Sequence, residues 1–233
     1  MEENDKPIRS TPTEVTGEVA AIALNAVPMV GGVLSNIANT FIEKRQNRRL
    51  NEFLVDLAER LRQLETRVNS EFVRKNEFEN LAEDIFSKAA ETRQDEKLDA
   101  FKSIFLNTVI SDRPSYNEAA EIADLVHRWQ DRHVILLRIL ADPLAADHEL
   151  GNVVGPGGFL MTSISAILGK LLPNWNEDQI DRTWQDLYDA QIHRTPGTTT
   201  VITDGGIHQL ENRLTDFGRK VAKYIVGPSA EQR

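Results

Sequence analysis

The five histidines are the side chains best suited to metal binding or to proton transfer near neutral pH. They are His127, His133, His148, His193 and His208, and the chain contains no cysteine. No two of them have the i, i+4 spacing that lets two imidazoles on one helix bind zinc. The segment Asp147-His148-Glu149 would need further ligands from a distant part of the chain to hold a metal. The histidine pattern therefore predicts no metal site.

The glycine-rich segment 151–158 has the composition of a loop that binds phosphate through its backbone amides. It lacks the Lys-Ser/Thr pair that completes such a loop, and no strand pattern precedes it. No Gly-x-Ser-x-Gly sequence is present that would expose a serine nucleophile. We interpret the segment as a connector, and we expect no catalytic residue, no cofactor and no enzymatic activity. An enzyme whose pocket has no recognisable short motif is an alternative, but no residue of the sequence supports it.

The charge balance disfavours polyanionic partners. The 233 residues include 36 acidic and 27 basic side chains, which gives a net charge of −9. Nucleic-acid binding relies on Lys and Arg to neutralise phosphates, so an acidic chain needs a local basic patch to achieve it. The first five residues are acidic and polar, whereas a secretory signal is basic and then apolar. We expect a cytoplasmic protein for which nucleic acid is a disfavoured partner.

Helical periodicity dominates the sequence, so we expect a mainly α fold in two parts. The first part is an N-terminal helical bundle over 11–130, preceded by a disordered tail over 1–10. Its first helix starts at Thr11-Pro12-Thr13-Glu14, which has the residues of a capping box with proline at the first helical position. The bundle holds a hydrophobic helical hairpin (17–42), a heptad helix (43–72), and amphipathic helices over about 75–92, 95–110 and 116–129.

The hairpin is unusual because no charged residue occurs from Val19 to Ile42. A stretch of that length could cross a bilayer, which needs about 20 helical residues. Three asparagines and the break at Pro28 and Gly31-Gly32 argue against a conventional span. Three interpretations stay open: a hairpin buried in the core, a hairpin that inserts into a membrane after oligomerisation, or a docking surface for a partner protein. The residues expected to make the hairpin contact are Val19, Ile22, Val33, Leu34, Ile37 and Phe41.

The heptad helix carries apolar residues at spacings of 4, 3, 4, 3 and 4 from Leu50 to Val68. This spacing is typical of a coiled-coil seam, with charged residues on the other faces. Such a seam packs either on other helices of its own domain or on a second copy of the chain. In the second case the oligomer seam consists of Leu54, Leu57, Leu61 and Leu64.

The second part, over 131–228, is expected to be a winged-helix-like α+β unit with one small β-hairpin. Helices at about 133–141, 159–172 and 176–192 precede a β-branched run, Thr198 to Thr203, and a turn at Asp204-Gly205-Gly206. A second strand within 207–214 and a final helix to Val226 complete the order. The tail Leu214-Thr215-Asp216-Phe217-Gly218 resembles the Leu-Thr-x-x-Gly segment that follows the wing in many bacterial winged-helix proteins. The resemblance implies a winged-helix fold and, in much of that family, DNA binding.

In a winged-helix protein one helix contacts the DNA, and the residue types of the corresponding helix in this chain argue against DNA binding. The helix 176–192 carries five carboxylates against Arg182 alone. A helix in the major groove passes between rows of phosphates, which repel carboxylates. Trp184 and Tyr188 lie one turn apart on it and either anchor the core or form a surface for a protein partner.

Together these patterns favour a non-enzymatic interaction and assembly protein that forms a homo-oligomer and binds a protein partner. Uncharged helical hairpins joined to an assembly helix resemble, in architecture, the membrane-disrupting effectors of bacterial defence systems. That resemblance implies a hairpin that engages a membrane on oligomerisation. The alternative is a winged-helix transcriptional regulator that dimerises through the long helix.

Overall fold

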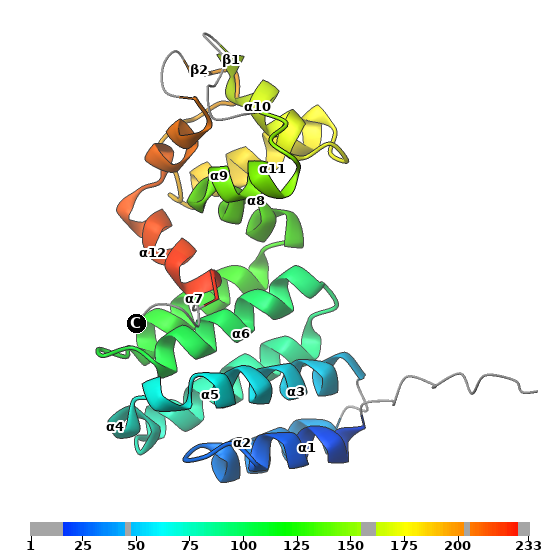
Figure 1. The fold of residues 1–233 in the computed structure, drawn as a ribbon, viewed down its shortest axis with the longest axis vertical. Coiled ribbons are helices and arrows are strands. Elements are labelled where there is room, and N and C mark those ends of the chain that lie inside the picture. The colour runs from blue at the N-terminus through cyan, green and yellow to red at the C-terminus, as the bar shows by residue number, and fades with distance from the viewer. Residues whose placement is uncertain (1–15, 45–47, 155–161, 203–205, 228–233) are drawn as a thin grey trace, which may run out of the picture.

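The computed structural model describes residues 16–44, 48–154, 162–202 and 206–227. These residues are mainly helical, with one small two-stranded antiparallel sheet (Figure 1). The predicted fold class, mainly α with a small β element, is therefore confirmed. The predicted tail over 1–10 and the residues of the predicted capping box at Thr11 lie outside the described residues. The predicted helix start at Thr11 is wrong, because Thr16 is extended and its hydroxyl oxygen accepts from the Val19 N–H, which caps a helix that begins at Gly17.

The helices predicted over about 75–92, 95–110, 116–129, 133–141 and 176–192 are present, whereas the one predicted over 159–172 begins only at Ile164 and a further helix over 143–149 was not predicted. In the first part the helices are α1 (Gly17–Asn25), α2 (Gly31–Lys44), α3 (Arg48–Gln63), a 3₁₀ helix (Glu65–Arg67), α4 (Ser70–Val73), α5 (Asn76–Glu91), α6 (Asp95–Val109) and α7 (Tyr116–Arg128). In the second part they are α8 (Asp131–Ala141), α9 (Pro143–Glu149), α10 (Ile164–Leu171), α11 (Glu177–Asp189), a 3₁₀ helix (Gly206–Arg213) and α12 (Asp216–Ile225). The strands β1 (Thr162–Ser163) and β2 (Val201–Ile202) pair antiparallel.

The predicted heptad helix over 43–72 is interrupted, since α3 ends at Gln63. Asn69 explains the interruption, because its side-chain oxygen accepts from the backbone N–H groups of Glu71 and Phe72 and so caps a new helix, α4. The same residue donates from its backbone N–H to the carbonyl oxygen of Val109, at the end of α6. The chain therefore turns at Asn69 toward α6 instead of continuing the helix.

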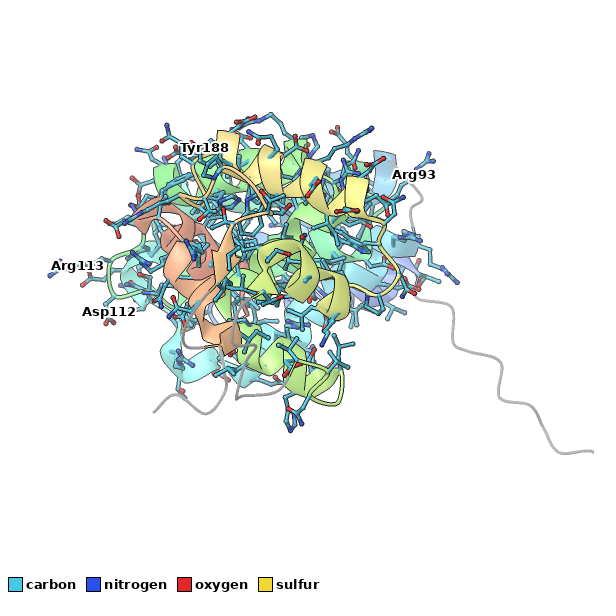
Figure 2. All side chains as sticks on the ribbon, turned by 90° about the horizontal axis from the view of Figure 1, so that it is seen from above. Arg93, Asp112, Arg113 and Tyr188 are labelled. Atoms are coloured by element: carbon cyan, nitrogen blue, oxygen red, sulfur yellow. The ribbon has the colours of Figure 1, made fainter. Side chains whose placement is uncertain are left out.

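Helix α6 is the centre of the N-terminal part. Figure 1 shows the helices stacked in layers, with α1 and α2 at one end, followed by α3 and α5 and then by α6 and α7. Eleven of the fifteen residues of α6 are buried. Arg93 precedes α6 and Asp112 and Arg113 follow it, and Figure 2 shows them on opposite sides of the molecule. Helix α6 therefore crosses the whole width of the fold.

Two buried lysines connect α6 to its neighbours. Lys97 Nζ donates to the carbonyl oxygens of His127 and Trp129, both at 2.7 Å, and so holds the C-terminal end of α7. Lys102 Nζ forms an ion pair with Asp56 of α3. Burial lowers the pKa of Lys97, against the opposing field of the Asp131 carboxylate.

Helix α12 returns from the second part and docks on the first. The Asn107 side chain of α6 donates to three carbonyl oxygens at the end of α12, those of Lys223, Tyr224 and Val226, at 3.1, 3.0 and 2.8 Å. Lys220 Nζ lies 2.7 Å from Glu118 Oε1 of α7. One cluster of buried apolar side chains includes residues of both predicted parts. The hydrophobic core is therefore continuous across residue 130, where the sequence predicts a boundary.

The small sheet has a different second strand from the one expected within 207–214. Ile202 of β2 pairs with Thr162, and Val201 pairs with Ser163, which lies before α10. The segment Gly206–Arg213 forms a 3₁₀ helix instead. Ile207, Leu210 and Leu214 are buried at spacings of three and four residues, and this spacing places apolar side chains on one side of a helical turn rather than on one face of a strand.

The Leu-Thr-x-x-Gly segment fixes the start of α12 against the end of α11. Thr215 Oγ1 accepts from the Gly218 N–H at 2.8 Å, which caps the helix, and the Thr215 N–H donates to the carbonyl oxygen of Ile192 at 3.0 Å. Leu214 is buried. A Cβ on Gly218 would lie 1.9 Å from the Ile192 carbonyl oxygen, so only glycine fits there. The segment thus has a structural role, and the winged-helix resemblance stays a prediction.

The contact at Gly218 gives a test of this docking. Gly218→Ala forces a methyl group onto a backbone oxygen, and we expect it to lower the free energy of unfolding by about 2–3 kcal/mol. Gly169→Ala is the matched control, because a Cβ at this exposed position in α10 meets no atom within 4 Å. It should raise stability by about 0.5–1 kcal/mol, since alanine favours a helix. Urea unfolding of both variants measures the difference, and equal effects would contradict the tight contact.

Candidate interaction surface

Helices α1 and α2 form a hairpin, and a glycine at each end lets the two helices approach closely. A Cβ on Gly17 would lie 2.2 Å from Ile42 Cγ2, at the open end of the hairpin. A Cβ on Gly31 would lie 2.5 Å from the carbonyl oxygen of Leu24, next to the turn. Two antiparallel helices approach this closely only where small residues meet the neighbouring helix.

One side of the hairpin is buried on α3 and α5. Leu34 has no exposed surface and Ile37 is 9% exposed, while Val33 is half-buried against the same core. The ring of Phe41 packs edge-on against Phe86 of α5, with centroids 6.5 Å apart. Four of the six residues expected to make the hairpin contact therefore pack in the core or against it, as in the buried-hairpin interpretation.

The other two expected contact residues lie on the opposite side of α1. Val19 is 43% exposed and Ile22 is 69% exposed, and Met29 in the turn is 56% exposed. We call the exposed apolar and amide side chains of the hairpin the hairpin face; they are Val19, Ile22, Asn25, Ala26, Met29, Asn36 and Asn39. The exposed carboxylates Glu18 and Glu43 border this face, and the hairpin lies at one end of the stack of helices (Figure 1). This is an apolar and amide surface with no neighbour in the described chain.

Met29 has a backbone conformation that favours glycine. Its φ is +65°, in the left-handed region that a side chain makes unfavourable by about 1–2 kcal/mol. The turn itself is well formed, because the Gly31 N–H donates to the carbonyl oxygen of Val27 at 2.9 Å. A methionine with backbone strain and an exposed side chain is the kind of outlier that points to a role outside the fold.

The leucine seam packs within its own chain. Leu54, Leu57 and Leu61 have no exposed surface, and Leu64 is 5% exposed. They belong to the same core as the buried side of the hairpin. An oligomer through these leucines would require α3 to leave that core.

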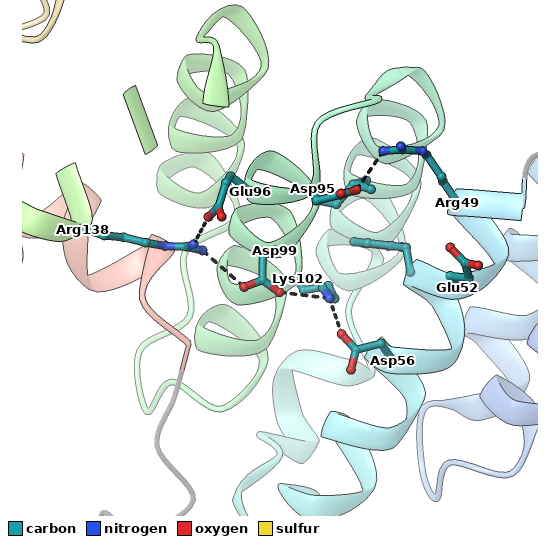
Figure 3. A pocket seen from close by; sticks show the side chains of 10 residues that line it. Arg49, Glu52, Asp56, Asp95, Glu96, Asp99, Lys102 and Arg138 are labelled. Atoms are coloured by element: carbon teal, nitrogen blue, oxygen red, sulfur yellow. Dashed lines mark hydrogen bonds and ion pairs between the residues drawn. The ribbon is translucent and has the colours of Figure 1, made fainter. Parts of the chain in front are cut away.

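A cleft of about 420 Å³ lies between α3, α6 and α8. Ten side chains line it, and eight of them are charged: Arg49, Glu52, Asp56, Asp95, Glu96, Asp99, Lys102 and Arg138. Figure 3 shows a chain of ion pairs across the cleft, from Arg138 through Asp99 and Lys102 to Asp56. This cleft is not predictable from the sequence, because its charged residues come from three helices and look there like separate solvated faces.

The charged side chains of the cleft form ion pairs, although its five carboxylates outnumber its three cations. Lys102 Nζ lies 3.0 Å from Asp99 Oδ1, Arg49 Nη1 lies 2.8 Å from Asp95 Oδ1, and Arg138 pairs with Glu96. Burial acts to raise the pKa of Asp99, but the three surrounding cations outweigh burial and hold the pKa below its ordinary value. Because every charged side chain has an opposite partner, we interpret the cleft as an ion-pair network that joins three helices.

Trp184 lies in the core and Tyr188 is half-buried beside it. The Trp184 indole N–H donates to the carbonyl oxygen of Thr195 at 2.7 Å, and the Trp184 ring lies against that of His193, with centroids 4.0 Å apart. His193 Nδ1 accepts from the Thr195 N–H, so its Nε2 carries the proton and donates to the carbonyl oxygen of Trp184 at 3.0 Å. Of the two residues expected at a partner surface, only Tyr188 has accessible area (Figure 2).

The exposed side of α11 is acidic, as the sequence predicts. Asp186 accepts from His133 Nε2 at 3.0 Å, Asp181 accepts from the Thr198 hydroxyl, and Asp189 accepts from the Gln185 side chain at 2.8 Å. Glu177, Asp178 and Asp189 are exposed. Phosphates of a nucleic acid would be repelled from this helix.

The turn of the hairpin gives a second test. Gly31→Ala places a methyl group against two carbonyl oxygens of α1, and we expect it to lower the free energy of unfolding by about 2 kcal/mol. Gly32→Ala, one residue further along α2, meets no atom within 4 Å and should be neutral or stabilise by up to about 1 kcal/mol. Chemical denaturation measures the free energy of unfolding of both variants. If both variants were equally stable, the hairpin would not be closed as tightly as described.

The neutral His193 imidazole predicts loss of stability in acid. Burial lowers the pKa of His193 from 6.5 to about 4, although hydrogen bonds to backbone groups of Trp184 and Thr195 act in the opposite direction. Between these two pKa values the unfolded chain binds a proton that the folded chain does not, so stability is full above pH 6.5 and falls as the pH drops toward 4. Lowering the pH from about 7 to about 5 should therefore lower the free energy of unfolding by about 2 kcal/mol through His193.

A glutamine at position 193 can still donate to the Trp184 carbonyl but does not titrate. Urea unfolding at both pH values should therefore show a smaller loss in His193→Gln than in the wild type. The same loss in both proteins would show that His193 titrates normally.

Comparison with known proteins assigns no family. No protein-family model matches the sequence. No curated protein and no solved structure matches it at a significant level. In the part of the chain that the structure describes, no helix combines the length and apolarity needed to span a bilayer, and no cluster of three or more His, Asp or Glu side chains could hold a metal ion. The hairpin face is the candidate site that the geometry supports.

Proposed function

We propose that this protein is a non-enzymatic interaction and assembly protein whose docking surface is the hairpin face. The observation that carries the proposal is the exposure of Val19, Ile22 and Met29 on a face that has no charge. Covering such a face removes apolar area from water, which contributes about 25 cal/mol per Å². None of its side chains is charged, so covering them carries no penalty for removing an ion from water.

The remaining surfaces support an interaction role better than a catalytic or DNA-binding one. Each charged side chain of the cleft has an ion-pair partner, which for Glu52 is Arg48 outside the cleft, and this pairing favours a structural network over a general acid or base. Helix α11 presents carboxylates where a DNA-reading helix would need Lys and Arg. Neither surface provides the chemistry of the alternative functions.

Contact with a membrane surface is a second candidate for the same face. Ile22 and Met29 protrude from it and could enter the boundary between lipid headgroups and acyl chains, where interfacial helices bury an apolar face. This is the role expected of a defence-type effector that engages a membrane on oligomerisation. It differs from protein docking in what covers the face, not in which residues are covered.

Site-specific photo-crosslinking tests the proposed surface. A benzoylphenylalanine replaces Ile22 in the cells that naturally produce the protein, and a matched variant carries it in place of Val201. Val201 is 47% exposed and lies at the opposite end of the molecule from α1 (Figure 1). We expect ultraviolet light to give adducts from position 22, whether with protein or lipid, and none from position 201. If the variant is folded but gives no adduct at position 22, the proposed function is wrong.

A further inference from the structure

We propose that the occupant of the hairpin face is a second copy of this chain, so that two hairpins meet face to face in a symmetric dimer. The inference rests on the proposed function, because it uses the same surface, and it adds the identity of the partner. In such a dimer the same patch of both copies is in contact, and the patch must be complementary to itself.

Charge is the first requirement for a self-complementary patch. Each copy has a net charge of −9, so two copies repel one another at most orientations. In a symmetric contact, a charge near the two-fold axis lies close to the same charge of the other copy. The segment from Val19 to Ile42 has no charge, and only Glu18 and Glu43 border it. Glu18 and Glu43 are exposed one helical turn from Ile22 and Asn39, at the open end of the hairpin, so two acidic copies can meet on the hairpin face when these carboxylates stay at the edge of the contact.

The exposed amides meet the second requirement. Asn25, Asn36 and Asn39 are exposed on the hairpin face. A side-chain amide both donates and accepts hydrogen bonds, so it can pair with the same amide of a second copy. In the hydrocarbon of a membrane the same groups would lose their hydrogen bonds with water at a cost of several kcal/mol each. The amides favour a protein surface over lipid.

The apolar side chains have the spacing of a helix–helix contact. Val19, Ile22, Ala26 and Met29 are separated by three, four and three residues, which is the spacing of a coiled-coil seam. Val19 and Ile22 are on α1, Ala26 follows its last residue, and Met29 is in the turn, and all four are exposed. Two antiparallel copies of this seam give a layer of four helices, two from each chain.

The expected dimer is weak. Helix α2 has 14 residues and is about 21 Å long, and two adjacent helices are about 20 Å wide, which gives a projected footprint of about 400 Å². Specific interfaces cover about 800 Å² of each partner. Association should therefore be reversible and dependent on concentration in the micromolar range.

The absence of cysteine makes a direct test possible. Ile22→Cys gives one thiol per molecule, and a short bismaleimide links two such thiols only when two copies meet at α1. Val201→Cys is the matched control, since Val201 is exposed at the far end of the fold. We expect covalent dimers of the full-length protein from Ile22→Cys in proportion to its self-association, and monomers from Val201→Cys.

Sedimentation velocity from low to high micromolar concentration measures the dimer without a crosslinker. Ile22→Glu should weaken the dimer at least about tenfold, because it places two carboxylates at the contact. Met29→Gly should weaken it too while leaving thermal stability unchanged or raised, since it relieves a left-handed residue. This combination separates a lost contact from a damaged fold. Circular dichroism confirms that each variant is folded.

Three outcomes would overturn the inference. The wild type could remain monomeric at high micromolar concentration with no Ile22→Cys dimer. It could instead bind neutral or anionic phosphatidylcholine-based vesicles in a way that Ile22→Glu abolishes, which would assign the face to a membrane. Adducts from position 22 with a different protein would assign it to that protein. The last two results leave the proposed function intact, whereas the absence of any adduct overturns both proposals.

Discussion

The arrangement of the helices depends on how the polar side chains of the buried helix α6 find partners. A buried ammonium or amide without a partner is costly, so each such group fixes the element that supplies one. Lys97, Lys102 and Asn107 are five residues apart, and each is rotated by about 140° around the helix from the previous one. They therefore face three directions, toward the end of α7, toward α3 and toward the end of α12. One helix thereby positions both parts of the chain.

Periodicity predicted the helices that pack by their apolar faces, including the ones that became α5, α6 and α7. It did not predict the partners of Lys97 or Asn107, because those partners are backbone carbonyls 30 or more residues away. It also failed between 207 and 214, where the glycine turn favoured a strand while Ile207 and Leu210 have helical spacing. The leucine seam was equally ambiguous, since a seam looks the same whether its partner helix belongs to its own chain or to another.

The candidate surface could be predicted only in part. The absence of charge from Val19 to Ile42 marks the hairpin in the sequence, but α1 has apolar side chains on two sides. Ala20 and Leu24 face the core, whereas Val19 and Ile22 face outward, and that choice depends on where α3 lies. The charged cleft could not be predicted at all. In the sequence its residues look like solvated helix faces, but they form ion pairs between three helices once these helices have packed.

The positions at which this chain has glycine bear on the role of Met29. At Gly31 and Gly218 a side chain would collide with backbone oxygens, and the chain has glycine there. At position 29 the backbone is left-handed and also favours glycine, yet the residue is methionine and its side chain is mostly exposed. The core gains little from that side chain, while backbone hydrogen bonds hold the turn around it. An unbranched, adaptable apolar side chain is suited to an interface, and burial against a partner would further offset the strain.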